Sequence, residues 1–333
     1  MTACFDLCKK GLIIKRAVVL LNMGGPSNLF EVETFLKNMF YDEHILRIKS
    51  RFLRKLVGSF IVNKRLSQAQ DNYKKIGGKS PITPLTFALI EKLAQKRQDL
   101  IFTYAMRYTP PYAEMVAKDL QENGVEELLL FSLYPQYSTT TTLSSIKDFK
   151  QSMHHLNFSP QTKEIVRFYD HPLFLRCIQK RISEALKDRD PKDYVLIFSA
   201  HGLPQSIIQQ GDPYQKECQH HVEILKDFLH QEGMDFEDVL LSYQSRLGPM
   251  KWIEPFTEDV VKTMKGKKVL IYPLAFTIDN SETHYELDIE LRQTAQESGV
   301  AEFLVCACPN ESDEFVELIL NLVEGELPCD IKR

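Results

Sequence analysis

The stretch VLIYPLAFTIDNSETHYELDIE, residues 269–290, joins a short apolar run to a segment rich in acids. Residues 269–276 are short and apolar enough for a buried strand, and a helix is predicted directly after them. With Asp279 as its N-cap, Glu282 and Glu286 fall at helical spacings on one face of that helix. A strand followed at once by a helix is the repeating unit of α/β folds.

The acids of this segment call for an explanation, because like charges four residues apart destabilise a helix by roughly 0.2–0.5 kcal/mol per pair. Capping is one explanation, since Asp279 followed by Glu282 resembles a capping box. A second stretch, VLIFSAHGLP at residues 195–204, favours a functional one, because it places His201 at the carboxyl end of another apolar run. Ligands bind at that end of open parallel sheets. An imidazole and a carboxylate meeting there could bind a divalent metal or move protons.

Composition limits the class of protein. With 333 residues, 44% of them hydrophobic, the chain can bury a large core and is long enough for two domains. A formal charge of −4 and a pI of about 6.2 give no reason to expect a nucleic-acid partner. No apolar run approaches the roughly 18–20 residues that span a bilayer, and residues 1–15 make a poor signal peptide. The seven scattered cysteines suit a reducing compartment, so a cytoplasmic location is predicted.

Apolar runs ending in Gly/Pro turns alternate with helical segments along the chain, and the pattern repeats coarsely. Residues 18–26 have a counterpart at 195–204, and residues 128–135 have one at 269–273. This rhythm predicts two similar α/β units with parallel sheets and a cleft that collects strand ends from both.

Residues 44–66 carry arginines and lysines and no acid, interleaved with large apolar side chains. Such a stretch can lie on an anionic membrane surface, or it can be the solvated basic face of a helix. The residues alone leave both interpretations open.

Several segments together are specific enough to indicate a family. The chain resembles ferrochelatases, enzymes that insert ferrous iron into a porphyrin to make haem. The matching segments are LLNMGGP at 20–26, IGGKSP at 76–81, MRYTPP at 106–111, LYPQYS at 133–138, FSAHGLP at 198–204, GDPY at 211–214, YQSRLGPMKW at 243–252 and DNSETHYELDIE at 279–290. Each segment alone is a weak signal, and their order along the chain makes the resemblance specific.

The resemblance implies an α/β fold with two Rossmann-like domains, each a four-stranded parallel sheet flanked by helices. Residues 1–155 would form the first domain, including a lip of the porphyrin pocket, and the C-terminal helix 310–333 would join it. Residues 156–309 would form the second domain and carry the metal-insertion residues. The basic stretch 44–66 lies where the family has its lip, which touches a membrane in some members; a peripheral location at the inner membrane is therefore an expectation.

The family's site residues map onto this chain position by position. His201 and Glu282 match the essential pair at the metal-insertion site and are expected to serve both catalysis and metal binding. Asp279 and Glu286 match acids that extend from that pair along a partly π-helical segment. The positions that match the walls of the substrate pocket are Met23, Arg107, Tyr108 and Trp252.

The reaction implied by the resemblance makes chemical demands that these groups could meet. A free porphyrin holds two N–H protons in a flat ring, so the ring must bend and the protons must leave before metal enters. A cleft can use binding energy from the rest of the macrocycle for this distortion, an effect of roughly 1–5 kcal/mol. An imidazole is a suitable acceptor for a pyrrole proton and a suitable ligand for Fe²⁺. We expect His201 and Glu282 to face one another across the bound ring.

Departures from the family pattern bear on metal content. Some relatives hold a [2Fe–2S] cluster through four cysteines, but Thr139 occupies the first of those positions here. The tail offers only Cys306, Cys308 and Cys329, at the wrong spacing. We therefore expect no cluster and no tightly bound cofactor, with Fe²⁺ as a substrate. Asn280 replaces a second histidine of some members.

Two alternatives concern the substrate and the class of function. Members that use coproporphyrin tend to have tyrosine at the position of Met23, so protoporphyrin IX is the expected porphyrin. A tetrapyrrole or metal carrier without catalysis is the other alternative. Such a carrier need not keep a proton acceptor, whereas this chain keeps both His201 and Glu282.

Overall fold

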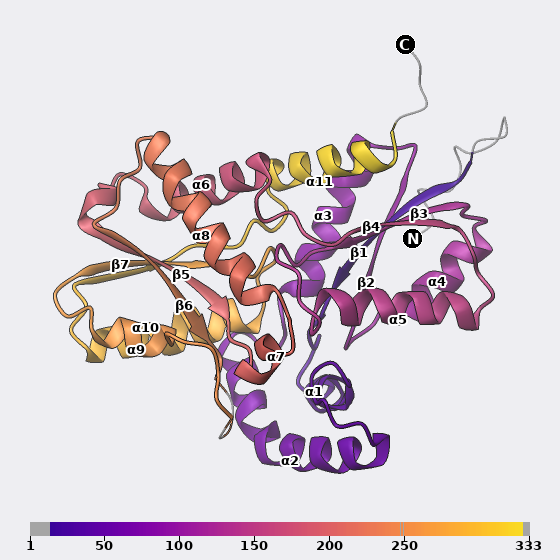
Figure 1. The fold of residues 1–333 in the computed structure, drawn as a ribbon, viewed down its shortest axis with the longest axis horizontal. Helices are drawn as coiled ribbons and strands as arrows, with labels where there is room; N and C mark the ends of the chain where they lie inside the picture. Colours follow the sequence, from indigo (N-terminus) through magenta and orange to yellow (C-terminus); the bar gives the residue numbers. More distant parts are fainter. Residues whose placement is uncertain (1–13, 247, 249, 329–333) are drawn as a thin grey trace.

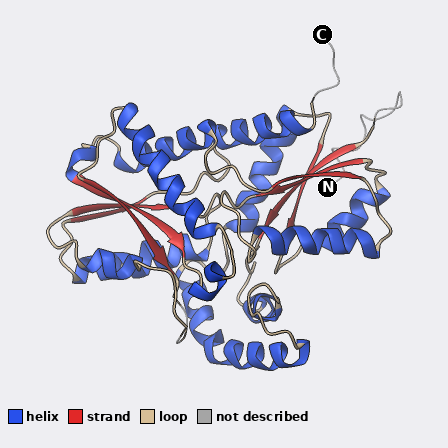
Figure 2. Cartoon of the chain, in the orientation of Figure 1, coloured by secondary structure: helices blue, strands red, loops and turns tan. Residues whose placement is uncertain are grey.

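The computed structural model describes residues 14–246, 248 and 250–328. Two parallel sheets lie side by side, each with helices on both faces (Figures 1 and 2). This is the α/β architecture that the alternating pattern of the sequence predicts, so that prediction is confirmed.

The first sheet has the strand order β2-β1-β3-β4, with every neighbouring pair parallel. The central strand β1 is buried along its whole length, as expected for an apolar run covered on both faces. Its strands and the helices that precede or follow them are β1 (Arg16–Asn22), α1 (Glu31–Tyr41), α2 (Arg51–Lys75), α3 (Ile82–Lys96), β2 (Ile101–Met106), α4 (Ala113–Glu122), β3 (Glu127–Ser132), α5 (Thr142–His155) and β4 (Gln161–Ile165).

The second sheet repeats this topology with the order β6-β5-β7-β8. The repeat expected from the sequence is thus present in space. The remaining elements are α6 (Pro172–Leu186), a 3₁₀ turn (Pro191–Asp193), β5 (Tyr194–His201), α7 (Gln205–Gln209), α8 (Tyr214–Gln231), β6 (Asp238–Gln244), α9 (Thr257–Lys262), β7 (Lys268–Pro273), a π-helix (Glu282–Glu290), α10 (Leu291–Glu297), β8 (Glu302–Val305) and α11 (Asp313–Glu326).

The domain boundary expected at residues 155/156 needs correction. Strand β4 pairs with β3, and Ile165 is buried against the first-sheet core, so the first sheet continues past residue 155. The physical reason for the error is that β4 is an edge strand with mostly polar residues, which carries no apolar run to mark it. The division therefore falls after Ile165.

Helix α11 packs against α3 and α6, and its end is tied to the first half of the chain. Arg97 forms a salt bridge with Glu324 at 2.5 Å, and Lys163 donates to the carbonyl of Glu326 at 2.6 Å. The assignment of the C-terminal helix to the first domain stays a prediction, because α11 also packs against α6 of the second half. Residues 329–333 of the expected helix lie outside the described part of the chain.

One hydrophobic core spans both sheets. Alternate residues of β1 divide between two cores: Val18 and Leu20 face the shared core, which also holds Leu196 and Phe198 of β5. On its other face, β1 packs with α4 and α5. This shared core packs the two sheets against one another.

Helices α1 and α2 and the loop between them form a separate layer below the two sheets in Figure 1, and we call this layer, residues 31–75, the lip. Their own apolar cluster includes Val32 and Phe35 of α1 and Val62 of α2, with Tyr108 joining them to the end of β2. Four large apolar side chains of α2 nonetheless face solvent: Phe52, Leu53, Leu56 and Phe60. Among the described residues no helix is both long and apolar enough to cross a membrane.

Candidate active site

His201 is the last residue of β5, at the carboxyl end of the second sheet. The hydroxyl of Tyr214 donates to the carbonyl of His201 at 2.9 Å and so fixes its backbone. The next residue must be glycine, because a Cβ at Gly202 would lie 2.7 Å from the carbonyl oxygen of Gln244. The Gly202 amide donates to that same oxygen at 2.8 Å, which brings the ends of β5 and β6 close together.

Glu282 begins the π-helix that follows β7. Asn280 caps this segment, since its side-chain oxygen accepts from the amide of Glu282 at 2.8 Å. The hydroxyl of Tyr73 in α2 donates to Ser281 at 3.0 Å and ties the start of the π-helix to the lip. The π-helical geometry expected from the family resemblance is therefore present, with Asn280 rather than Asp279 as the capping residue.

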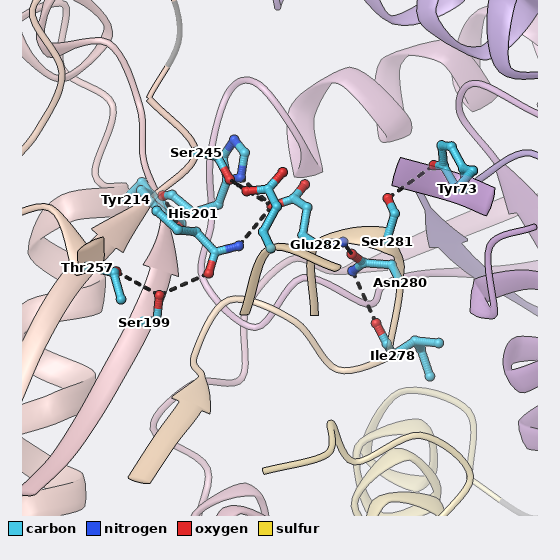
Figure 3. A network of polar contacts seen from close by, with 12 residues as sticks. Tyr73, Ser199, His201, Tyr214, Ser245, Thr257, Ile278, Asn280, Ser281 and Glu282 are labelled. Atoms are coloured by element: carbon cyan, nitrogen blue, oxygen red, sulfur yellow. Dashed lines mark hydrogen bonds and ion pairs between the residues drawn. The ribbon is translucent and has the colours of Figure 1, made fainter. Parts of the chain in front are cut away.

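The two side chains meet directly. Nδ1 of His201 lies 2.7 Å from Oε2 of Glu282, and Figure 3 shows them pointing toward one another. His201 ends β5, and Glu282 lies in the π-helix that follows β7. The strand order reverses between these two strands, and the crevice outside such a reversal is where open α/β sheets bind ligands. The His201 side chain keeps 36% of its surface exposed, so a ligand can reach it.

A layer of hydrogen bonds holds Glu282 in place. Gln244 at the end of β6 donates through Nε2 to Glu282 at 3.1 Å. The other amide atom of Gln244 accepts from Ser199 at 2.9 Å, and Ser199 also contacts Thr257 at 2.9 Å. These buried partners fix the orientation of the Gln244 amide and, through it, the position of the carboxylate.

Burial and the neighbouring charge shift the pKa values of His201 and Glu282 in opposite directions. Burial alone would lower the pKa of His201, but the adjacent Glu282 carboxylate outweighs it, and the pKa lies above its usual value. For Glu282, burial favours the neutral acid, yet His201 and the donors Gln244 and Ser245 bring its pKa below the usual value. The pair is thus stabilised as imidazolium and carboxylate.

Glu286 lies next on the same face of the π-helix. Its burial and the charge of Glu282 raise its pKa to about 7. The hydroxyl of Ser245 donates to Glu286 and lies 3.4 Å from Glu282, so it bridges the two carboxyl groups. Ser245 adopts a left-handed backbone conformation with φ of 68°, which is uncommon for a residue with a side chain and occurs at sites where a group must be aimed.

Asp279 lies apart from this group. Its carboxylate accepts from the side chain of Asn310 at 2.6 Å and from the amide of Cys308 at 3.3 Å, and its own amide donates to Asn310 at 2.8 Å. These bonds hold the loop between β8 and α11. The structure therefore does not bring Asp279 together with His201 and Glu282, which corrects its expected place in the acidic path.

The first domain contributes a wall formed by the ends of β1 and β2. The amide of Tyr108 donates to the carbonyl of Met23 at 2.9 Å, which places these two positions side by side. Arg107 lies against the ring of Tyr108 and forms a salt bridge with Asp42 at 3.0 Å. Asp42 also accepts from the hydroxyl of Tyr108 at 3.0 Å and from Ser144 at 2.6 Å.

Tyr134 shows that the two halves converge. Burial raises the pKa of this phenol well above its usual value, and both Asp42 of the first domain and Glu282 of the second act on it in the same direction, against Arg107. Tyr134 follows β3, so a residue of the first domain lies within electrostatic reach of the catalytic pair. A direct contact also joins the two halves here, since the hydroxyl of Thr277 donates to the carbonyl of Leu133 at 2.7 Å.

Trp252 is buried under the loop that follows His201. It forms an isolated bridge with Pro204, and its ring lies 3.4 Å from the position that a Cβ of Gly202 would take. Its 8% exposure leaves little of the indole for contact with a ligand. In this arrangement Trp252 supports the loop that carries His201.

Three residues at this site did not emerge from the sequence as functional: Gln244, Ser245 and Tyr214. All three occur in segments quoted above, YQSRLGPMKW and GDPY, so their neighbourhood was indicated although their roles were not. Nothing in a lone glutamine or serine distinguishes a residue that orients a carboxylate from one that faces water.

The metal-ligating side chains present are an imidazole and two carboxylates. Within residues 14–246, 248 and 250–328, no three histidine, cysteine or acidic side chains are arranged as a metal-binding group. His201 and Glu282 nevertheless offer a nitrogen and an oxygen ligand at one point, and Fe²⁺ accepts both kinds.

Known proteins similar to this chain were found by sequence. The ferrochelatase family model matches residues 15–327. A protein from Helicobacter pylori (strain G27) described as ferrochelatase is 54% identical over 312 residues, which cover 93% of this chain and 93% of that protein. Another so described, from Wolinella succinogenes, is 50% identical over 315 residues, covering 94% of this chain and 100% of that protein.

Solved structures with the same fold are much less similar in sequence. SirB from Bacillus subtilis, determined with Fe³⁺, aligns with a TM-score of 0.57 at 12% identity and covers 93% of this chain and 94% of its own. CbiX, described as the terminal enzyme for biosynthesis of siroheme in denitrifying bacteria, aligns with a TM-score of 0.54 at 13% identity, covering 94% and 100%. These similarities show the fold.

Proposed function

The chain belongs to the ferrochelatase family, and from that premise we propose that its reaction depends on the joined side chains of His201 and Glu282. The enzyme inserts Fe²⁺ into protoporphyrin IX with loss of two protons and yields protohaem, the terminal step of haem biosynthesis. It is a lyase that forms nitrogen–metal bonds. The observation that carries the proposal for the two residues is their 2.7 Å contact at the crevice between β5 and β7.

His201 is the proposed acceptor of a pyrrole proton. In the neutral form of His201, Nδ1 donates its hydrogen to the Glu282 carboxylate, so Nε2 is the atom that can take up a proton, and the carboxylate stabilises the imidazolium that results. The reaction releases two protons per ring, so a second group must help to carry them away. Glu286 fits this task because its pKa of about 7 lets it bind or release a proton near neutral pH, and Ser245 links it to Glu282.

The pair approaches the ring as one unit. We expected His201 and Glu282 to face each other across the porphyrin, but a 2.7 Å contact leaves no space for a ring between them. That expectation is corrected: both groups act from the same side of the macrocycle. A single site can then receive the proton at the imidazole while the carboxylate meets the incoming cation.

The path of the iron is proposed to run along the π-helix through Glu286, without Asp279. Glu290 continues this face, and burial raises its pKa as it does that of Glu286. Carboxylate oxygens at successive positions could replace waters around the entering ion. Met23, Arg107 and Tyr108 are proposed as the opposing wall of the porphyrin pocket, and Trp252 as a support of the His201 loop.

Membrane contact through residues 44–66 is proposed from the surface of the lip. Phe52 and Phe60 expose 74% and 71% of their surface, and Leu53 and Leu56 lie on the same helix with about half of theirs exposed. Arg51 and Lys55 are also exposed there. An exposed apolar face rimmed by basic groups suits the boundary of an anionic membrane, where both porphyrin and apolar side chains partition. We propose a cytoplasmic enzyme with peripheral contact at the inner membrane.

The expectation of no iron–sulfur cluster stays a prediction. Thr139, at the place of the first cluster cysteine, donates to Asp212. Cys306 and Cys308 are buried with raised pKa values, and Cys329 lies outside the described residues. An absorption spectrum of aerobically purified protein tests this, since a cluster would add iron–sulfur bands.

The function is tested by titration with porphyrin and Fe²⁺ under anaerobic conditions while haem absorbance is followed. Protoporphyrin IX and coproporphyrin are tried in turn, and the expected result is faster turnover with protoporphyrin IX. Binding without haem formation with either porphyrin would indicate a carrier and would overturn the proposal.

A further inference from the structure

A group of hydrogen bonds joins the two domains through residues other than His201 and Glu282. On the second domain it is formed by Asp212 at the start of α8, and on the first by the loop of residues 137–139 that follows β3. We call this set of contacts the interdomain knot. Asp212 is 5% exposed, so its carboxylate is removed from water and must be satisfied by protein groups.

Asp212 uses both oxygens. Oδ2 accepts from the hydroxyl of Ser138 at 3.0 Å, from the amide of Thr139 at 2.8 Å and from the hydroxyl of Thr139 at 2.5 Å. Oδ1 accepts from the amide of Tyr214 at 3.0 Å. Charge-assisted bonds of this kind are stronger than neutral ones. A single carboxylate therefore fastens a first-domain loop to the first turn of a second-domain helix.

The side chain of Tyr214 connects the interdomain knot to His201. Tyr214, whose amide Asp212 holds, donates its hydroxyl to the carbonyl of His201 at 2.9 Å. A second acid of the same helix strengthens the attachment, since Glu217 accepts from the amide of Tyr137 at 2.7 Å. The 137–139 loop is thus connected through Asp212 and Tyr214 to the backbone of His201.

The lip is fastened at the same point. Arg47 donates to the hydroxyl of Thr139 at 2.6 Å and also to the side chain of Gln210, two residues before Asp212. Lip, first domain and second domain therefore meet at Thr139.

We propose that Asp212 is a positioning residue for metal insertion, holding His201 at the spacing from the first-domain wall that the bound macrocycle requires. The inference rests on the proposed role of His201. A displacement of about 1 Å at a reacting group can cost roughly a hundredfold in rate, so an anchor remote from the chemistry can limit turnover.

The test uses Asp212→Asn, Thr139→Val and Tyr214→Phe in the full-length protein, with Leu120→Ala as a control for stability. Leu120 is buried in the core between the first sheet, α4 and α5, away from the knot. Porphyrin binding is followed by quenching of Trp252, the only tryptophan. Iron insertion is followed by haem absorbance across pH, and hydrogen exchange is measured by mass spectrometry over residues 137–141 and 212–218.

Asp212→Asn is expected to lower kcat/KM for porphyrin about tenfold or more, to speed exchange in both peptides, and to move the ascending limb of the pH profile to lower pH as His201 leaves Glu282. Tyr214→Phe should move the pH limb without speeding exchange in the first-domain peptide. Thr139→Val should change kcat/KM, hydrogen exchange and the pH limb in the same directions as Asp212→Asn, by smaller amounts. If Asp212→Asn does not fold, Thr139→Val provides the test. Leu120→Ala should lower the melting temperature and leave the pH limb in place.

The proposal is overturned if Asp212→Asn and Thr139→Val keep wild-type kcat/KM and the wild-type pH limb, whatever their stability. A failure of the proposed function gives a different result, because wild-type protein would then bind porphyrin without inserting iron.

Discussion

Nδ1 of His201 lies 2.7 Å from Oε2 of Glu282, although the two residues are 81 positions apart in the sequence. The contact exists because β5 and β7 are neighbours in the sheet and both end at the same edge. The contact raises the pKa of the imidazole and lowers the pKa of the carboxylate, at a point that a ligand can reach. Each of the first two predictions depends on this contact.

Removal of either partner should stop iron insertion. His201→Ala removes the proton acceptor and Glu282→Gln removes the charge that stabilises the imidazolium, so each should lower kcat by roughly 10²–10⁴-fold. Quenching of Trp252 should show porphyrin binding in both variants. His284→Ala removes an exposed imidazole from the same π-helix and serves as the control. Near-normal haem formation by either site variant would refute the assignment.

The pH dependence of kcat/KM should depend on Glu282. His201 must be neutral to accept a proton, so activity should rise with pH through its raised pKa. Without the carboxylate, burial would dominate and lower the pKa of His201. The residual activity of Glu282→Gln should therefore show its ascending limb at lower pH than the wild type does. An unchanged or higher limb would mean that another group controls the rate.

Glu286→Gln should stabilise the protein at alkaline pH. The pKa of Glu286 is raised from 4.5 to about 7 in the folded state, so the folded protein binds the proton more tightly than the unfolded chain. Stability is therefore lost as pH rises from 4.5 through 7, by an amount on the order of 3 kcal/mol. Denaturant unfolding should show the variant more stable than wild type at pH 8, with a gain that shrinks toward pH 5. A gain independent of pH would contradict this origin.

The exposed face of the lip should control binding to lipid. The double variant Phe52→Ser with Phe60→Ser should bind vesicles of mixed neutral and anionic lipid at least tenfold more weakly, since a buried phenylalanine contributes roughly 1.5–3 kcal/mol. Co-sedimentation measures this. Phe87→Ser is the matched control, because Phe87 is exposed on α3, outside the lip. Equal binding of all three proteins would leave the lip without this role.

Gly25 should not accept a side chain. A Cβ there would lie 2.5 Å from the hydroxyl and 2.6 Å from the Cβ of Ser80, both part of buried loops beside the first-domain wall. Gly25→Ala should therefore lower the free energy of unfolding by about 1–3 kcal/mol. Gly325→Ala, in α11 with open space around it, should instead raise it by about 0.5–1 kcal/mol. Chemical denaturation of the two variants gives the comparison.

The sequence predicted the sheet strands with continuous apolar runs, and it indicated His201 and Glu282, whose side chains lie in contact. Runs such as residues 195–200 are typical of buried strands of a parallel sheet, and the carboxyl end of such a strand is where the topology places a ligand site. The family resemblance supplied the partner Glu282 and the π-helical geometry.

Other features depend on contacts that no local pattern encodes. Asp279 looks like a helix cap in sequence, but its carboxylate turns to Asn310, a residue of a distant loop. Strand β4 has no apolar run because it lies at an edge. The left-handed backbone of Ser245 has no sequence signal, since glycine would be the usual residue at such a position.

Because Glu282 and Glu286 lie on a π-helix, the relative direction of their side chains depends on the number of residues between them. The hydrogen bonds of this helix close over five residues instead of the four of an α-helix, so each turn contains more residues. Deleting one residue between Glu282 and Glu286 would favour the tighter α-helical winding. Both acids would remain, but the carboxyl group of Glu286 would point in a different direction from the helix axis. Relatives or engineered forms could therefore redirect the route of an incoming ion by gaining or losing a single residue, and an alignment that scores only amino-acid identity would overlook the change.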